Sequence, residues 1–172
     1  MSALVSRGTK VAQRPQAPSS LAWRAIETSD DVRGLVARVV LGAVIFPHGA
    51  QHLLGWFGGF GFHGTRAWME STLGVPRIVA GSSIVLELAA PILLVVGAGG
   101  RFAAAWMAAF LAVAASTHAS SGFFMNWLGN QKGEGFEYHF LAIALAVTVV
   151  LTGSGKLSVD RWLTTRAAES SR

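Results

Sequence analysis

The chain has 172 residues, of which 52% are hydrophobic and 13% are charged, and its formal net charge is +5. Soluble domains contain about 25% charged residues, so this composition excludes a soluble globular protein and indicates a one-domain integral membrane protein. The basic excess is typical of cytoplasmic loops, and no nucleic-acid-binding motif accompanies it. The chain has no cysteine, which excludes disulfides, iron–sulfur clusters ligated by the chain, thiolate catalysis and covalent c-type haem.

The N-terminal residues 1–33 are polar and basic. They contain no apolar run of the kind found in signal peptides, so we expect a flexible cytoplasmic tail. Within this tail, residues 21–26 (LAWRAI) are predicted to form a short interfacial helix, and Asp30-Asp31 is a helix start signal for the segment that follows.

Four apolar segments come next, at about residues 34–54, 76–98, 101–119 and 138–152. A membrane-spanning helix needs about 20 residues, which the first three provide. The fourth is short and is expected to gain a turn from residues 135–137. The predicted fold is all-α: a four-transmembrane-helix bundle over residues 34–155, followed by a cytoplasmic C-terminal tail at 156–172.

The distribution of Lys and Arg predicts the orientation. Ten of them lie in the two tails and in the turn between the second and third spans, whereas the opposite side of the bundle holds three, Arg66, Arg77 and Lys132. The positive-inside rule then places both termini in the cytoplasm and the loops 55–75 and 120–137 outside. All five histidines fall at the outer end of this bundle: His48, His52, His63, His118 and His139.

Several of these histidines are candidates for chemistry. His48, Gln51 and His52 share one helix face, because they are spaced i, i+3 and i+4. His48 and His52 form an HxxxH pair that is compatible with metal ligation, with His118, His139 or a carboxylate completing the shell. The alternative is a polar cap or ligand pocket, since buried polar groups are normally satisfied by hydrogen bonds.

Two ionisable side chains lie within the predicted spans. Glu87 falls near the middle of the second span, where a carboxyl group should be protonated or paired. Arg38, on the first span, is expected either to pair with Glu87 or to extend to the cytoplasmic headgroups.

The outer loops carry aromatic and amide side chains among glycines, including Trp56, Asn126 and Trp127. Residues 65–73 are predicted to form a short amphipathic helix capped by Thr65. One interpretation of the aromatic residues is interfacial anchoring. The other is a lid over a pocket between the helices, suited to a flat, partly apolar headgroup such as a quinone.

Several motifs in order resemble the DoxX family of bacterial membrane proteins. They are residues 38–42 (RVVLG), 46–51 (FPHGAQ), 55–59 (GWFGG), 97–105 (GAGGRFAAA), 122–124 (GFF) and 135–139 (GFEYH), together with Glu87 and His118. The resemblance covers about residues 34–155. It implies a four-helix bundle in the bacterial inner membrane and a link to membrane redox systems, including thiosulfate:quinone oxidoreduction.

The resemblance also implies site residues. These are Arg38, His48, Gln51, Glu87, His118, Glu137 and His139. The chain departs from the family motif at position 52, where a lysine is usual and His52 stands here. This departure makes an anionic substrate less expected and metal ligation more so.

The first functional hypothesis is therefore a subunit of a membrane redox system that binds a quinone or a small oxidant beneath the outer loops. His48, His118 and His139 would move protons, because histidine titrates near neutrality, with Glu87 as a further catalytic group. The candidate cofactor-binding residues are Arg38, Gln51, Trp56, Asn126, Trp127 and Glu137.

The second hypothesis is a non-enzymatic accessory or assembly subunit that anchors a redox partner protein or a second copy of the chain. Small residues at 81–83, 103–105 and 108–109 permit close helix contacts with such a partner, or within the bundle itself. A transporter or channel is the third hypothesis. It ranks last, because four short spans leave little room for alternating access.

Overall fold

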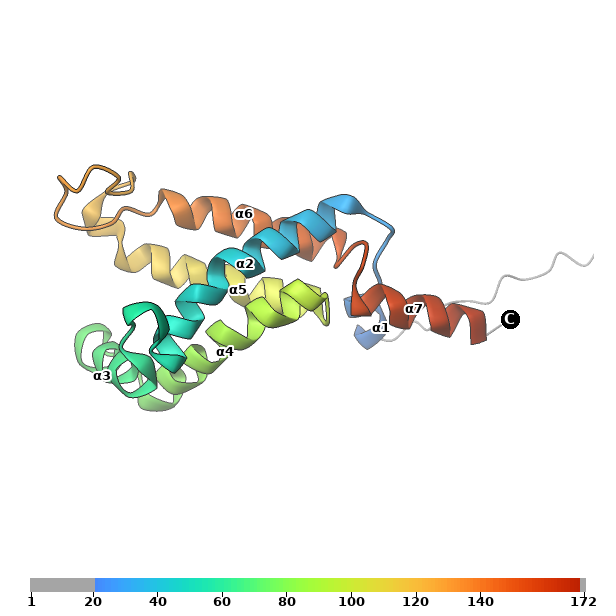
Figure 1. The fold of residues 1–172 in the computed structure, drawn as a ribbon, viewed down its shortest axis with the longest axis horizontal. Coiled ribbons are helices and arrows are strands. Elements are labelled where there is room, and N and C mark those ends of the chain that lie inside the picture. Colours follow the sequence, from blue (N-terminus) through green and yellow to red (C-terminus); the bar gives the residue numbers. More distant parts are fainter. Residues whose placement is uncertain (1–20, 171–172) are drawn as a thin grey trace, which may run out of the picture.

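A computed structural model describes residues 21–170, which contain helices and turns but no strand (Figure 1). The elements in chain order are α1 (Leu21–Ile26), α2 (Val32–Leu54), the 3₁₀ turn η1 (Trp56–Gly58), α3 (Gly61–Leu73), α4 (Arg77–Val96), α5 (Gly100–Thr117), the 3₁₀ turn η2 (Ala119–Ser121), α6 (Glu137–Thr152) and α7 (Val159–Ser170). The all-α prediction is confirmed for this part of the chain. Residues 1–20 of the predicted N-terminal tail lie outside the described residues.

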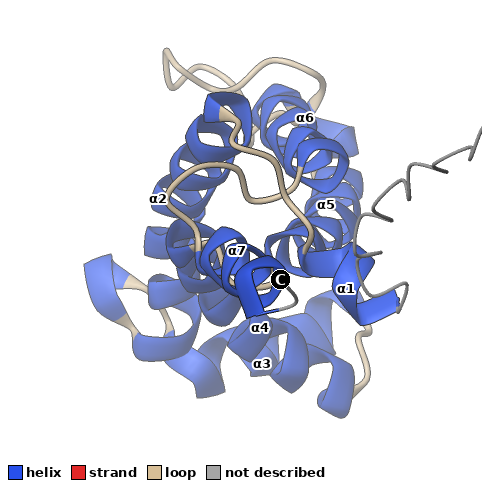
Figure 2. Ribbon diagram, turned by 90° about the vertical axis from the view of Figure 1, so that its right-hand side faces the viewer, coloured by secondary structure: helices blue, strands red, loops and turns tan. Residues whose placement is uncertain are grey.

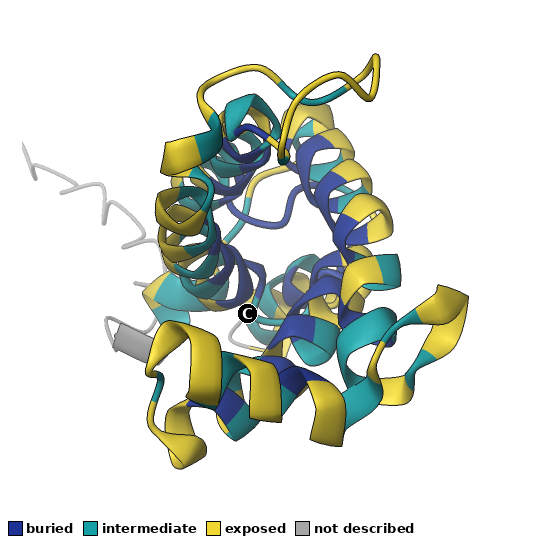
Figure 3. Cartoon of the chain, turned by 90° about the vertical axis from the view of Figure 1, so that its left-hand side faces the viewer, coloured by how far each residue is buried: buried dark blue, intermediate teal, exposed yellow. Residues whose placement is uncertain are grey.

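The four long helices form a ring in which α2, α6, α5 and α4 each pack on the next, and α4 closes the ring on α2 (Figure 2). Helix α3 packs on α2 and α4 near one end of the ring, while α1 and α7 lie at the other end. Each helix turns its small and apolar residues inward and exposes further apolar residues on the outside (Figure 3).

The outer surface is that of a protein in lipid. Val36, Val40 and Val44 are exposed at a four-residue spacing along α2. Among the described helices, α2, α4 and α5 are long and apolar enough to cross a membrane. Helix α6 is apolar but has 16 residues, or about 24 Å of helix against the ~30 Å of a hydrocarbon core. The chain is therefore a multi-pass membrane protein with three spans of full length.

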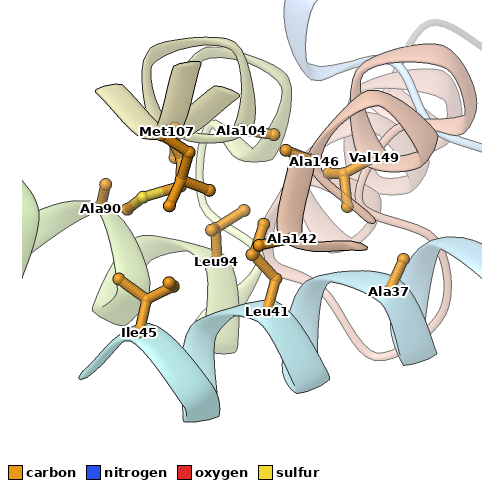
Figure 4. Close-up of a cluster of buried hydrophobic side chains, with 12 residues drawn as sticks. Ala37, Leu41, Ile45, Ala90, Leu94, Ala104, Met107, Ala142, Ala146 and Val149 are labelled. Atoms are coloured by element: carbon orange, nitrogen blue, oxygen red, sulfur yellow. The ribbon is translucent and has the colours of Figure 1, made fainter. Parts of the chain in front are cut away.

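The core of the ring is built from small and aliphatic side chains (Figure 4). Leu41 on α2 and Leu94 on α4 lie in it with Met107 on α5. Ala103 and Ala104 belong to the same core, so two of the small residues considered as partner contacts pack inside the chain.

Two glycines bring α2 and α4 into backbone contact. A Cβ atom on Gly42 would lie 2.8 Å from the carbonyl oxygen of Pro91, and one on Gly49 would lie 2.6 Å from the carbonyl oxygen of Glu87. Because Pro91 has no N–H, the Glu87 carbonyl lacks its usual helical donor, and the Gly49 backbone covers it. This close approach places the C-terminal half of α2 against the middle of α4.

At the end of the ring near the termini, a buried arginine ties three segments together. Arg38 is 1% exposed, and all five of its N–H groups donate to backbone carbonyls. The acceptors are the carbonyl oxygens of Leu94 at 3.0 Å, Val95, Ser154 at 2.7 Å, Lys156 at 3.0 Å and Leu157 at 2.7 Å. Both expectations for Arg38 are wrong, because it neither pairs with Glu87 nor reaches the membrane surface.

A buried carboxylate completes this end. The oxygens of Asp160 accept hydrogen bonds from the backbone N–H groups of Gly99, at 2.8 Å, and Gly100, at 3.0 Å, at the start of α5. The Ser154 hydroxyl donates to the same carboxylate at 2.6 Å. Asp160 lies on α7, a helix that the sequence interpretation had not predicted within its C-terminal tail.

The predicted helix boundaries agree with the structure within a few residues for the apolar segments, and the predicted helix at 21–26 is confirmed as α1. The amphipathic helix in the first outer loop begins at Gly61, four residues before its predicted start. Thr65 is therefore not its cap. It is buried inside α3, and the N-terminal residue Phe60 makes no side-chain cap.

Replacing Arg38 by lysine should destabilise the bundle strongly. Lysine offers three donors, so at least two of the five carbonyls lose a charge-assisted hydrogen bond worth about 1.5–3 kcal/mol. We expect the free energy of unfolding to fall by about 3–5 kcal/mol in a denaturing-detergent titration. Arg33→Lys, on the same helix with its side chain 80% exposed, is the control and should change by less than about 1 kcal/mol. Equal losses in the two variants would contradict a central role for Arg38.

Candidate functional site

At the end of the ring away from Arg38, the helices enclose a cavity of about 410 Å³. It lies between the halves of the four long helices that are far from Arg38, with α3 and the loop after α5 contributing to its wall. The lining residues are Ile45, His48, His52, Thr65, Trp68, Met69, Leu73, Glu87, Phe110, Leu111, Val113, Ala114, Thr117, His118, Met125, Glu134, Tyr138 and His139. Most of this wall is apolar, and its polar groups come from all five of these helices and from the segment between α5 and α6.

The buried carboxyl group of Glu87 has a histidine partner. Its Oε2 lies 2.7 Å from Nδ1 of His52, while the Glu87 residue is 4% exposed. Of the two predicted alternatives, a protonated or a paired Glu87, the structure has the contact of a pair, but with His52 rather than with Arg38. The close backbone contact at Gly49 makes this pair possible, because it brings α2 near enough for an imidazole to reach α4.

Two further cavity histidines, His118 after α5 and His139 on α6, lie next to each other, and His48 lies on α2 one turn before His52. The rings of His118 and His139 have centroids 5.1 Å apart, and the ring of Tyr138 lies 6.3 Å from that of His48. The Nδ1–H of His118 donates to the carbonyl oxygen of Glu134 at 3.1 Å. Four of the five histidines thus line one cavity, as predicted. The fifth, His63, is exposed on α3 and is not among the lining residues.

Three buried polar atoms of the lining residues have no hydrogen-bond partner among the described residues. They are Oγ1 of Thr65, the hydroxyl of Tyr138 and Nδ1 of His139. Thr65 is 5% exposed and His139 is 9% exposed. Because buried polar atoms are normally hydrogen-bonded, these three mark positions where a ligand or bound water would supply the missing partner.

The predicted cofactor-binding residues lie elsewhere. Arg38 belongs to the hydrogen-bond network at the far end of the ring. Trp56 lies in the segment between α2 and α3 and is 53% exposed. The amide of Gln51 donates from Nε2 to the carbonyl oxygen of Phe57 at 3.3 Å, which fastens that loop to α2. None of these three side chains is among the cavity lining.

The polar residues of the loop between α5 and α6 form hydrogen bonds within that loop and to the start of α6. Asn126 bonds through its side chain to the backbone of Gln131, at 3.0 and 3.2 Å, and its own N–H donates to Glu134 at 2.9 Å. The indole N–H of Trp127 donates to Oε1 of Glu137 at 2.9 Å. The cavity wall receives Met125 and Glu134 from this loop instead.

Sequence reasoning missed Thr65, Trp68, Met69 and Tyr138 as cavity residues. The first three lie on α3, whose amphipathic pattern was recognised but was interpreted as part of the loop structure. Tyr138 stands beside His139 in a motif already singled out, so its position next to a candidate histidine was the available signal.

A metal site at His48 and His52 stays a prediction. Within residues 21–170, no group of three or more His, Cys, Asp or Glu side chains is arranged to hold a metal ion. Of the two predicted ligands, His52 already uses its Nδ1 atom in the contact with Glu87.

The ring of apolar helices and its enclosed polar cavity define a multi-pass helical membrane protein with a small-molecule-sized site. The sequence model of the DoxX family matches residues 34–124, more than half of the chain, so the chain belongs to the DoxX family. This match includes Glu87 and the four cavity-lining elements up to the end of α5. Searches of curated proteins and of solved structures gave no significant match.

A double-mutant cycle should reveal the coupling between His52 and Glu87. His52→Leu leaves a buried carboxylate without its partner and should reduce the free energy of unfolding by about 3 kcal/mol. Glu87→Gln removes the charge, so adding His52→Leu to it should cost less, with a coupling energy of about 1–3 kcal/mol. His63→Leu, outside the cavity, is the control and should have little effect. Strict additivity of the two single changes would show that the pair is not energetically coupled.

Proposed function

We propose that this DoxX-family protein is the ligand-binding subunit of a membrane redox system, with a quinone or a similar small molecule bound in the cavity. The observation that carries the proposal is the combination of an apolar wall with three unsatisfied buried polar atoms. An apolar pocket with a few convergent polar groups is the usual form of a small-molecule site. Its volume suits a ring system of one or two rings.

The lining residues provide the groups that such a ligand requires. The flat side chains of Trp68 and Phe110 offer apolar surfaces for a ring, while the hydroxyl of Tyr138 is a donor for a ligand carbonyl oxygen. His139 and His118 lie side by side, and an imidazole ring can accept a proton on one nitrogen and donate one from the other. A bound quinone would accept two electrons and two protons to become a quinol.

The electrons for that step would come from a redox partner protein, because this chain has no cysteine and its own side chains are not electron carriers. This places the chain in a subunit role. The alternative of a purely structural assembly subunit draws less support, because Ala103 and Ala104 pack inside the bundle and Gly81 faces the ring of Phe62.

We further propose that all four helices of the ring cross the membrane, with both termini in the cytoplasm and the cavity in the outer half. The position of α6 between α2 and α5 supports this topology, as does the excess of Lys and Arg near the termini. The short α6 would be accommodated by local thinning of the bilayer.

The topology can be tested with single cysteines, because the native chain has none. Asn130→Cys places a thiol in the exposed loop between α5 and α6, and Ser170→Cys places one at the exposed end of α7. We expect a membrane-impermeant maleimide to label the first variant in intact bacterial cells and the second only after lysis. If α6 does not cross, the two sites lie on the same side and label alike, which would contradict the four-span topology.

The binding function predicts that quinones quench the fluorescence of Trp68. In the purified protein, a neutral naphthoquinone should cause a saturable quench that is largely lost in Trp68→Phe. Trp162→Phe, on α7 at the far end of the molecule, is the matched control and should retain it. A quench that does not saturate, or that is the same in both variants, would contradict binding in the cavity.

A further inference from the structure

We propose that the cavity takes an uncharged ligand and admits it sideways from the bilayer, through a gap between α3 and α5 edged by Trp68, Leu73 and Val113. This inference rests on the proposed function and specifies both the charge of the ligand and its route. It depends on three observations: the charges of the cavity wall, the divergence of two helices, and the exposure of residues that belong both to the cavity and to the lipid-facing surface.

The charges of the wall disfavour an anion. No Lys or Arg is among the lining residues, whereas two carboxyl groups, those of Glu87 and Glu134, are. The remaining ionisable lining groups are four imidazoles and one phenol, and one of the imidazoles is engaged by Glu87. A small oxyanion would therefore lose its hydration without gaining a fixed cationic partner. A neutral carbonyl compound would lose little and would gain donors from Tyr138 and an imidazole.

The shape of the bundle leaves one side of the cavity thinly covered. The end of α4 and the start of α5 meet at the turn after Val96, and the two helices diverge from there toward the end of the bundle that holds the cavity (Figure 1). Helix α3 packs on α2 and α4, while α5 packs on α4 and α6. The cavity, which α3 and α5 both line, is thus covered least between these two helices, since neither makes an extensive contact with the other.

Exposure identifies the mouth. Along α5, a stripe of exposed residues faces the surrounding lipid: Phe102, Ala105, Ala109, Ala112, Val113 and Ser116. Val113 belongs to this stripe and is 66% exposed, yet it also lines the cavity. Across the gap, Trp68 is 50% exposed and Leu73 is 38% exposed, and both line the cavity from α3. A residue can meet both conditions only where the cavity reaches the outer surface.

The part of the mouth edged by Trp68, Leu73 and Val113 is apolar. Thr117 and Glu134, which also line the cavity and are exposed, lie toward the loop after α5. Val113 lies four residues before the end of α5, or about 6 Å along the helix axis, and its neighbours on the stripe are apolar or small. A compound dissolved in the bilayer can enter without leaving an apolar environment, and a hydrocarbon tail can remain in the gap while the ring occupies the cavity. A water-soluble anion meets an apolar barrier at the same place.

The experiment uses the full chain in proteoliposomes and measures the saturable quench of Trp68, defined as the difference between the native protein and Trp68→Phe. Two probes are compared: a neutral naphthoquinone and its sulfonated, anionic analogue. We expect the neutral probe to quench and the anion to bind at least about tenfold more weakly. Val113→Phe narrows the mouth and should weaken or slow the quench by the neutral probe about tenfold. Ala109→Phe adds the same ring one turn away on the same stripe and should not.

Each result bears on a different statement. If neither probe quenches Trp68, the proposed function itself fails. If the neutral probe binds but the anion binds equally well, the inference about charge is overturned. If Val113→Phe behaves like Ala109→Phe while binding persists, the lateral route is overturned. Since both substitutions lie on the exposed stripe of α5, native unfolding behaviour in both variants establishes that the comparison reports on the mouth and not on folding.

Discussion

The hydrogen bonds from the Arg38 guanidinium to five backbone carbonyls are the constraint on which the rest of the structure depends. A charged group buried in a bundle of apolar helices must satisfy every donor, and here the last turn of α4 and the segment after α6 supply the acceptors. Helix C-termini present carbonyls without intrahelical partners, so the arginine and these carbonyls satisfy one another. Asp160 does the same for the N–H groups at the start of α5. One end of the ring is thereby closed by polar contacts that involve α2, α4, α5 and α7.

Closure at that end gives the opposite end its freedom to open. From the turn that Asp160 holds, α4 and α5 diverge, and α3 covers the base of the wedge without sealing its side. Helix α2 stays close to α4 along its length because Gly42 and Gly49 carry no side chain at the contact. The same contact brings His52 to Glu87, so the buried carboxyl group is paired inside a wall that is mostly apolar. The cavity is thus a consequence of how the helices are fastened, and its Glu87–His52 pair lies where the backbones of α2 and α4 come into contact.

Membership of the DoxX family and the apolar ring establish the class of protein, while the cavity gives a specific chemical proposal. The family resemblance alone implied a role for Arg38 in the site, but its donors are fully used in a structural network at the other end. With that arginine removed from consideration, the site has imidazoles, a phenol and two carboxyl groups facing an apolar wall. We therefore propose that the site binds a neutral ring compound rather than an oxyanion, and that this ligand enters from the bilayer.

The sequence by itself determined the four apolar helices and the gathering of His48, His118 and His139 at one end, because hydrophobic periodicity and the alternation of direction between successive helices require no tertiary information. It also showed that Glu87 needed a partner. Only the tertiary structure decided which partner, since the pairing depends on an interhelical approach of a few ångströms at Gly49 that no spacing along the chain specifies. For the same reason the sequence could not predict the role of Arg38 or the hydrogen bonds of Asp160 to the start of α5. It also could not predict that Thr65 and Trp68 line the cavity. Each depends on the position of one helix relative to another. That position is set by packing and by hydrogen bonds to backbone groups, and because these groups are the same in nearly every residue, the sequence does not show which of them will be used.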